Sequence, residues 1–210
     1  MNLNQPQQYA QLKRQVHQDF SASIVLQHYK KGDYIYFPSD TPERIYVIEE
    51  GIVKLGTYND DGAPVVHDII GPNYFFGNLR YLNNEYFNEF AKAATVLVVS
   101  AYHLPTIKAA FAENRTLNEW LTFMIIKRWA LTEARLARIS STRPVKRVQK
   151  IIIELEQLIP NSTTLNYKWF EVISQKDIAD LTGMTRQTVA KIFRELPLQE
   201  IPYYQESAMD

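Results

Sequence analysis

Hydrophobic and polar positions alternate with a period of two between residues 24 and 101, and turn-forming residues interrupt them. This alternation is typical of strands with one buried face. The dipeptide Asp61-Gly62 is a strong hairpin signal between two such runs. Many short strands with regular turns indicate an antiparallel β-roll or sandwich. The predicted strands are Ile24–Tyr29, Tyr34–Phe37, Arg44–Ile48, Ile52–Tyr58, Val65–Ile70 and Thr95–Ala101.

The period then changes to that of a helix, and Arg115 to Ile139 reads as one long element that Asn114 or Thr116 can cap. Between Trp120 and Leu131 this helix is apolar on almost every side. An all-round apolar helix needs cover on all sides. One face of this helix can pack on the roll. The other face is expected to pack against a second subunit, or alternatively to be buried within a single domain.

The segment Ser140–Pro144 breaks this helix, because proline suits a first turn and not a helix interior. A further amphipathic helix follows it, and Pro160-Asn161-Ser162 ends that helix. Leu165–Ile173 predicts a short strand pair or an extended loop. Residues 1–20 predict a short amphipathic helix.

Ser174 to Leu196 predicts two short helices joined by a tight turn. Ser174 can cap the first helix, with Asp177 in capping-box position, and Gly183 can end it in a left-handed conformation. Thr185 can cap the second helix, whose inner face is Val189, Ile192, Phe193 and Leu196. Its outward polar residues suit the major groove of DNA, although a plain helical hairpin has the same spacing.

The amino-acid composition and the charge limit the functions that this chain can have. The chain of 210 residues has no cysteine, which excludes disulfides and thiolate chemistry, and its formal net charge is +0. From Arg143 to Glu195 there are 9 Lys and Arg against 6 Asp and Glu, a net of +3 with the sign that DNA binding requires. The N-terminus predicts no signal peptide and no run suits a membrane span, so we expect a cytoplasmic protein without membrane contact.

The run Gly183-Met184-Thr185-Arg186-Gln187-Thr188-Val189-Ala190-Lys191 resembles the helix-turn-helix core of the cyclic-AMP receptor/FNR superfamily of bacterial transcription factors. Ile45 to Lys54 resembles the strand–glycine–strand of that family's cyclic-nucleotide-binding β-roll. The resemblance implies an α+β fold with a β-roll of double-stranded β-helix type, a long dimerisation helix and a winged helix-turn-helix. The implied domains are 1–113, 114–141 and 142–210. Pro197 to Glu206 lacks a glycine turn, which predicts a short or irregular wing.

The resemblance assigns DNA contacts residue by residue. Arg186, Gln187 and Lys191 match the base-reading positions. Arginine can donate twice to guanine and glutamine pairs with adenine, whereas the family usually has glutamate at Gln187 and arginine at Lys191. The expected phosphate contacts are Ser174, Thr185 and Thr188, which are also plain helix caps.

The roll departs from the family where a cyclic nucleotide would bind. Gly77 is kept, but Asn78 stands at the ribose-binding glutamate, and Phe87 falls near the phosphate-binding arginine. An aromatic, net acidic segment repels phosphate, so we expect no cyclic nucleotide. The pocket takes a more apolar effector or has become packed core, and both readings stay open. The candidate pocket residues are Gly77, Asn78, Leu79, Arg80, Tyr86, Phe87 and Asn88.

The sequence therefore predicts a homodimeric, sequence-specific transcription regulator and not an enzyme. Its expected partners are double-stranded DNA, a small-molecule effector and RNA polymerase, with no cofactor and no metal site. The candidate dimer residues on the long helix are Leu121, Met124, Ile125, Arg128 and Leu131. Two alternatives are a β-roll interaction module with vestigial DNA binding, and a haem-based sensor using His67, although a lone strand histidine is more often a surface residue.

Overall fold

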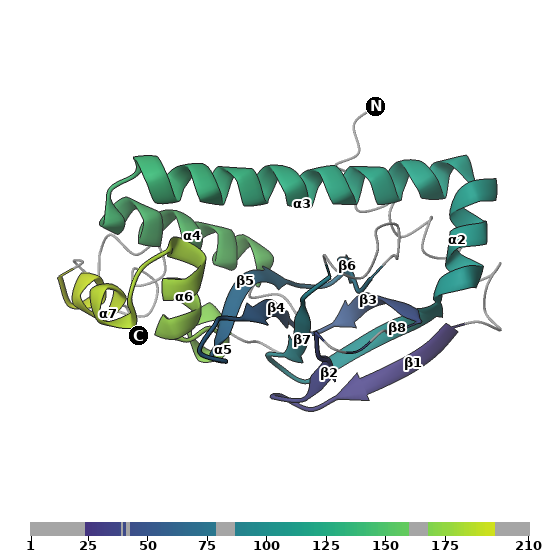
Figure 1. Cartoon of the computed structure of the whole chain (residues 1–210), viewed down its shortest axis with the longest axis horizontal. Helices are drawn as coiled ribbons and strands as arrows, with labels where there is room; N and C mark the ends of the chain where they lie inside the picture. The colour runs from purple at the N-terminus through teal and green to yellow at the C-terminus, as the bar shows by residue number, and fades with distance from the viewer. Residues whose placement is uncertain (1–23, 39, 41–42, 79–86, 160–167, 196–210) are drawn as a thin grey trace, which may run out of the picture.

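The computed structural model describes residues 24–38, 40, 43–78, 87–159 and 168–195. Within this part of the chain, strands occupy the N-terminal half and helices the C-terminal half (Figure 1). The predicted helix over residues 1–20 and the predicted wing after Pro197 lie outside the described residues.

The strands form two four-stranded antiparallel sheets that together make a roll. One sheet has the order β1-β8-β3-β6 and the other the order β2-β7-β4-β5. All six predicted strands agree within two residues at each end, and the third extends to Glu50 instead of ending at Ile48. The strands are β1 (Ile24–Tyr29), β2 (Tyr34–Tyr36), β3 (Arg44–Glu50), β4 (Val53–Tyr58), β5 (Pro64–Ile70), β6 (Phe75–Phe76), β7 (Phe90–Ala93) and β8 (Leu97–His103).

The β4–β5 hairpin shows how local sequence sets the register of the roll. The Asn59 N–H donates to the carbonyl of Ala63 at 3.0 Å, and the Gly62 N–H donates to the carbonyl of Asn59 at 2.9 Å. Gly62 has φ +74°, which glycine adopts without a steric cost. This confirms the hairpin predicted from Asp61-Gly62. Inside the roll, Ile48, Leu55 and Leu97 are fully buried.

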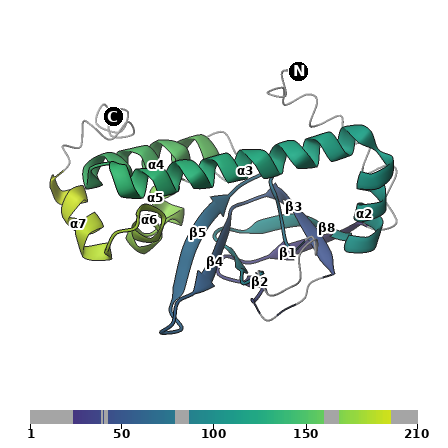
Figure 2. The ribbon, with the colours of Figure 1, turned by 45° about the horizontal axis from the view of Figure 1, so that its top comes forward.

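Two helices follow the roll. Helix α2 (Leu104–Glu113) turns the chain, and α3 (Arg115–Ser141) runs along the whole molecule (Figures 1 and 2). The Asn114 side chain caps α3 by accepting from the Leu117 N–H at 3.0 Å. Leu117, Leu121 and Met124 are buried between α3, α2 and the roll. One face of α3 is therefore covered by its own chain.

The remaining helices are α4 (Pro144–Leu158), α5 (Trp169–Val172), α6 (Gln175–Thr182) and α7 (Arg186–Glu195). Helix α4 begins at Pro144, so the break between α3 and α4 falls within the predicted Ser140–Pro144 segment. The core of these helices is continuous with the roll, since Ile152 and Ile178 share a cluster with Val66 and Phe90. The division into 1–113, 114–141 and 142–210 stays a prediction.

Three elements differ from the sequence-based expectation. The prediction of strand or loop up to Ile173 is wrong for Trp169–Val172, which forms α5 because the Lys168 N–H donates to Glu171 Oε2 at 3.3 Å and Trp169 is buried. Residues 165–167 lie outside the described part. Strands β6 and β7 and helix α2 were not predicted, since β6 and β7 are too short to show a period.

Candidate nucleic-acid interface and effector pocket

Helix α6 begins at the cap that the sequence predicts. The Asp177 N–H donates to Ser174 Oγ at 3.2 Å, and the Ser174 N–H donates to Asp177 Oδ2 at 2.7 Å. The box satisfies donors that a helix N-terminus leaves free. Gly183 ends α6 with φ +63° and ψ +41°, the left-handed conformation of a glycine C-cap. The first helix of the motif therefore starts and stops as predicted.

Helix α7 follows after a three-residue turn, Gly183 to Thr185. The Thr188 N–H donates to Thr185 Oγ1 at 3.2 Å, and the two threonine hydroxyls lie 2.9 Å apart. Val189 and Ile192 are buried under α7, which confirms its predicted inner face at these two positions. Leu196 lies outside the described residues. Thr185 therefore caps α7, and the predicted phosphate contacts at Thr185 and Thr188 sit together at its N-terminus.

The outward face of α7 carries the three predicted base-reading residues. Arg186, Gln187 and Lys191 are all exposed, and they come from the first two turns of the helix. Lys191 is held only by a 3.8 Å ion pair with Glu195, in which both side chains are more than half exposed. Exposed pairs of this kind are worth little, so the cationic face is available to a ligand.

The sequence did not reveal that α6 is docked on the roll. Lys54 Nζ of β4 lies 2.7 Å from Asp177 Oδ2, with both side chains largely buried. The backbone N–H of Val66 in β5 donates to Asp180 Oδ2 at 3.1 Å. Lys176 Nζ, which also pairs with Asp180, donates to the Pro64 carbonyl at 3.4 Å. The helix-turn-helix is therefore attached to one edge of the sensor-like roll.

Aromatic rings fill the interior of the roll beside the predicted pocket. The ring of Phe87, which stands near the expected arginine position, lies 5.9 Å from the ring of Tyr36. Tyr36 lies 6.1 Å from Phe76, and Phe76 stacks on Tyr46 at 5.1 Å. Rings at these separations pack favourably on one another. This arrangement favours the packed-core reading of the pocket over an apolar effector site.

The other predicted pocket residues give a mixed result. Gly77 has φ +110°, and a Cβ there would lie 3.1 Å from the Arg44 carbonyl, so the family's glycine is kept for backbone reasons. Asn78 is buried and Asn88 is exposed. Leu79, Arg80 and Tyr86 lie outside the described residues. The described members of the set therefore do not converge on one binding surface.

Charged groups lie between the roll and α3 instead. The Tyr36 hydroxyl donates to Glu89 Oε1 at 2.6 Å, and burial raises the pKa of Tyr36 well above its usual value. Glu89 Oε2 lies 3.7 Å from His67 Nε2. Burial raises the pKa of Glu89 and lowers the pKa of His67, so both groups favour their neutral forms despite their proximity. His67 therefore has a carboxyl partner.

A chain of ion pairs continues from this point to the helices. Asp68 of β5 pairs with Arg128 at 3.2 Å and with Arg135 at 2.8 Å. Arg135 and Arg138 of α3 both pair with Glu154 of α4. These side chains are largely buried, so their interactions are less screened than surface pairs. The network joins the roll, the long helix and the first helix after the break, and no pattern in the sequence predicted it.

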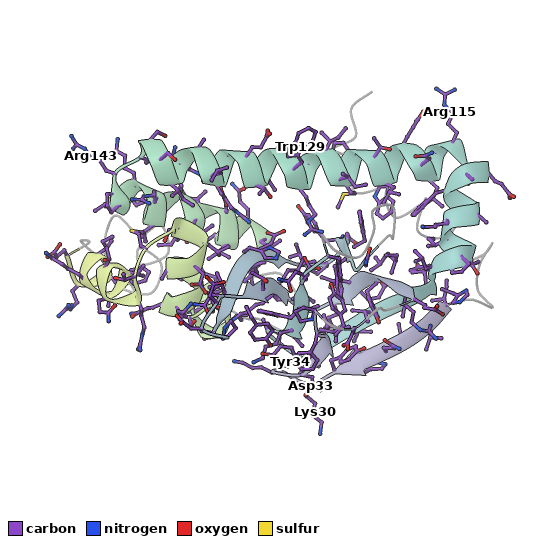
Figure 3. All side chains as sticks on the ribbon, viewed as in Figure 1. Lys30, Asp33, Tyr34, Arg115, Trp129 and Arg143 are labelled. Carbon is purple, nitrogen blue, oxygen red and sulfur yellow. The ribbon has the colours of Figure 1, made fainter. Side chains whose placement is uncertain are left out.

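The exposed face of α3 is not the set predicted from sequence. Leu121 and Met124 are buried under the helix, Arg128 points to Asp68, and Leu131 is half-buried. Of the predicted dimer residues, only Ile125 is exposed. The exposed apolar residues on this helix are Ile125, Ile126, Trp129, Leu136 and Ile139. Figure 3 places Trp129 on the side of α3 away from the roll.

These exposed side chains have the spacing of a coiled-coil seam. Ile125, Trp129, Thr132 and Leu136 follow one another at alternating intervals of four and three residues. This repeat lines one stripe of a helix and packs against a matching stripe of a partner helix. The predicted set of exposed residues on α3 was wrong because the helix is apolar on almost every side, so its sequence did not show which side the roll covers.

The described part of the chain contains no cluster of three His, Asp or Glu residues placed to hold a metal ion. No helix within these residues is both long and apolar enough to span a bilayer.

Comparison with known proteins bears on both halves of the chain. A family profile for the cyclic nucleotide-binding domain matches residues 26–114. A "CRP-like cAMP-activated global transcriptional regulator" from Mycobacterium tuberculosis is 24% identical over 163 residues, covering 78% of this chain and 73% of the relative. The "Global nitrogen regulator" of Synechococcus elongatus is 24% identical, with coverage of 82% and 79%.

Solved structures agree on the fold. FixK2 from Bradyrhizobium japonicum superposes with a TM-score of 0.69 at 19% identity, covering 84% of this chain and 85% of that one. The chain is therefore similar in sequence and in fold to regulators of the cyclic-AMP receptor/FNR superfamily. The regulator CLP of Xanthomonas campestris, described as responsive to c-di-GMP, superposes with a TM-score of 0.68 at 16% identity, with coverage of 87% and 90%. The superfamily fold predicted from sequence, a β-roll followed by helix-turn-helix helices, is thereby confirmed.

Proposed function

We propose that this protein is a dimeric, sequence-specific DNA-binding regulator of transcription. The observation that carries the proposal is the exposed row Arg186, Gln187 and Lys191 on a capped helix whose opposite face is buried. Arginine at the start of such a helix can reach guanine in the major groove, and glutamine can pair with adenine. The relatives named above are transcriptional regulators, which supports this role over an enzymatic one.

The second half of the proposal is a homodimer formed through α3. The seam from Ile125 to Leu136 leaves large apolar side chains exposed in one chain, with Trp129 62% and Leu136 64% exposed. Covering this stripe with its copy would bury apolar area and place two α7 helices on one DNA face. We expect two half-sites about one helical turn apart. DNA as the target places the protein's action in the cytoplasm, with RNA polymerase a candidate partner.

The signal that controls the regulator is not a cyclic nucleotide in this proposal. The roll interior is occupied by the rings of Tyr36, Tyr46, Phe76 and Phe87. The network from Asp68 through Arg135 to Glu154 gives a direct physical route by which a change in the roll alters the angle at the α3–α4 break. The haem alternative receives no support, because the His67 side chain is 45% exposed and its Nε2 lies 3.7 Å from Glu89 Oε2.

Mobility-shift assays on fragments of the source genome test the DNA-binding claim. We expect a specific complex whose affinity falls as salt rises, because lysine and arginine release counterions from DNA. Arg186→Ala should weaken specific binding by roughly 10- to 100-fold, the loss of a base contact. Lys146→Ala on the exposed part of α4 is the matched control. Equal affinity of wild type and Arg186→Ala for every fragment would refute the assignment of α7 as the reading helix.

A further inference from the structure

A small cavity lies where α3, α4 and α6 meet, next to the break between α3 and α4. Its lining combines three arginines, Arg135, Arg138 and Arg147, with apolar groups of the same helices. The remaining lining residues are Ile139, Ile151, Leu181 and Thr182. The space has room for about one water molecule or one monatomic ion. The lining of the cavity is therefore cationic on one side and apolar on the other.

Positive charge exceeds negative charge around this cavity. Glu154 pairs with Arg135 at 3.1 Å and with Arg138 at 2.5 Å. Asp68 pairs with Arg135 but also neutralises Arg128. No carboxylate in the described part of the chain pairs with Arg147. Four guanidinium groups thus share two carboxylates, and a buried excess of like charge is costly without a counter-charge.

One buried donor of a lining arginine lacks a hydrogen bond. Arg147 Nη1 donates to the Thr182 carbonyl at 2.9 Å, but the Nε of Arg147 has no acceptor among the described residues. Arg138 Nη2, in contrast, is paired with Glu154 Oε1 at 2.5 Å. Buried donors without acceptors are rare, and each one costs free energy. The unpaired donor of Arg147 belongs to a residue that lines the cavity.

We propose that this cavity is a binding site for a small inorganic anion of chloride size. An anion can accept from several guanidinium donors at once and also supplies the missing negative charge. A water molecule could accept one or two hydrogen bonds but would leave the charge excess. The apolar walls from Ile139, Ile151 and Leu181 favour a weakly hydrated monatomic ion over a larger oxyanion.

The position of the site suggests what occupancy does. Arg138 belongs to α3, Arg147 to the first turn of α4, and Thr182 directly precedes the Gly183 turn of the helix-turn-helix. An ion held by these arginines links the three helices across the break. Occupancy therefore stiffens the joint that positions α7. Anion binding at this site does not require DNA binding, and diffraction and thermal unfolding detect it without DNA.

Diffraction from crystals of the full chain grown in sodium bromide tests the site directly. Data collected at the bromine absorption edge should show an anomalous peak within about 3.5 Å of Arg147 Nε and an Arg138 guanidinium nitrogen, a charge-assisted contact distance. The proposal is overturned if ordered bromide appears elsewhere on the protein while this cavity holds water or nothing.

Thermal unfolding gives an independent readout in solution. Wild type should melt about 2–4 °C higher in 0.2 M sodium chloride than in sodium gluconate of equal ionic strength, because only the folded state binds chloride and gluconate is too large. Arg147→Gln and Arg138→Gln should each lose most of this difference. Arg143→Gln, at an exposed position beside the cavity, is the matched control and should keep it. Identical chloride effects in wild type and Arg147→Gln would overturn the site.

Discussion

The side chain of Asp177 shows how much one residue can determine in this fold. Its Oδ2 accepts from the Ser174 N–H, from Ser174 Oγ and from Lys54 Nζ, each at 2.7 Å. The first two contacts start α6, and the third attaches α6 to the roll. Only 8% of the carboxylate side chain is exposed. A single residue therefore sets both a helix terminus and the placement of the helix-turn-helix.

Asp177→Ala should lower the free energy of unfolding by about 3 kcal/mol, because it removes a cap and leaves the buried Lys54 without its counter-charge. Lys54→Met is the comparison, since it removes the ion pair but leaves the capping box intact. It should cost less than half as much. Urea denaturation followed by circular dichroism measures both. A similar loss for the two variants would show that the cap contributes nothing.

The buried side chain of Glu89 should make the stability of the folded state depend on pH. Burial raises its pKa in the folded state above 4.5, so the folded state binds more protons than the unfolded state above that value. Its contribution to stability is therefore largest at low pH and is lost as pH rises from about 4.5 through the folded-state pKa.

Glu89→Gln keeps an acceptor for Tyr36 and removes the titration. The variant should gain stability over wild type as pH rises from about 4.5 to 8, as measured by urea denaturation at several pH values. His67→Gln serves as a control for the neighbouring titration. A stability difference between Glu89→Gln and wild type that does not change with pH would contradict the role given to burial.

At the scale of elements, local rules account for much of the fold. The caps at Ser174 and Thr185 and the end of α6 at Gly183 follow from residue chemistry within one turn, so sequence predicted them. Strand β7 and helix α2 were missed because their periodicity is short or weak. The exposed face of α3 was misassigned because Leu121 and Ile125 are equally apolar, and only the position of the roll distinguishes them.

Glycines in the roll separate two physical effects. Gly51 has φ +95°, and a Cβ there would lie 2.3 Å from the Val96 carbonyl, so Gly51→Ala combines backbone strain with a clash. Gly62 has φ +74° but open space around it. We expect Gly51→Ala to lower the free energy of unfolding by roughly 3 kcal/mol and Gly62→Ala by about 1 kcal/mol. Chemical denaturation measures both values, and equal losses would contradict the packing argument.

At the scale of the whole molecule, the seam on α3 is the feature that a single chain leaves uncovered. Trp129→Asp or Leu136→Glu should shift sedimentation velocity profiles from dimer to monomer at micromolar concentration, because charge in a coiled-coil seam is strongly unfavourable. Glu119→Gln, an exposed change on α3 outside the seam, should leave the dimer intact. Dimers of unchanged stability in both seam variants would place the interface elsewhere.

Contacts between residues that are far apart in the chain could not be predicted from the sequence. The Lys54–Asp177 contact joins residues 123 positions apart, and the Asp68–Arg135 contact joins residues 67 apart. No local periodicity encodes such pairs. The same holds for the candidate effector pocket, since the fate of Phe87 depends on the packing of Tyr36 and Phe76 around it. The sequence alone predicts that the charged side chains which would bind a cyclic nucleotide are absent. It does not predict that aromatic rings occupy the interior of the roll.

The central claim is that two copies of α7 read DNA together, and selection from a random duplex DNA library by the full-length protein tests it most directly. The account predicts enrichment of a two-fold symmetric sequence with half-site centres about one helical turn apart. The same selection with Gln187→Glu should move the preference at one position of each half-site from adenine toward cytosine. Recovery of no enriched sequence, or of a symmetric site that Gln187→Glu and Arg186→Ala leave unchanged, would contradict it.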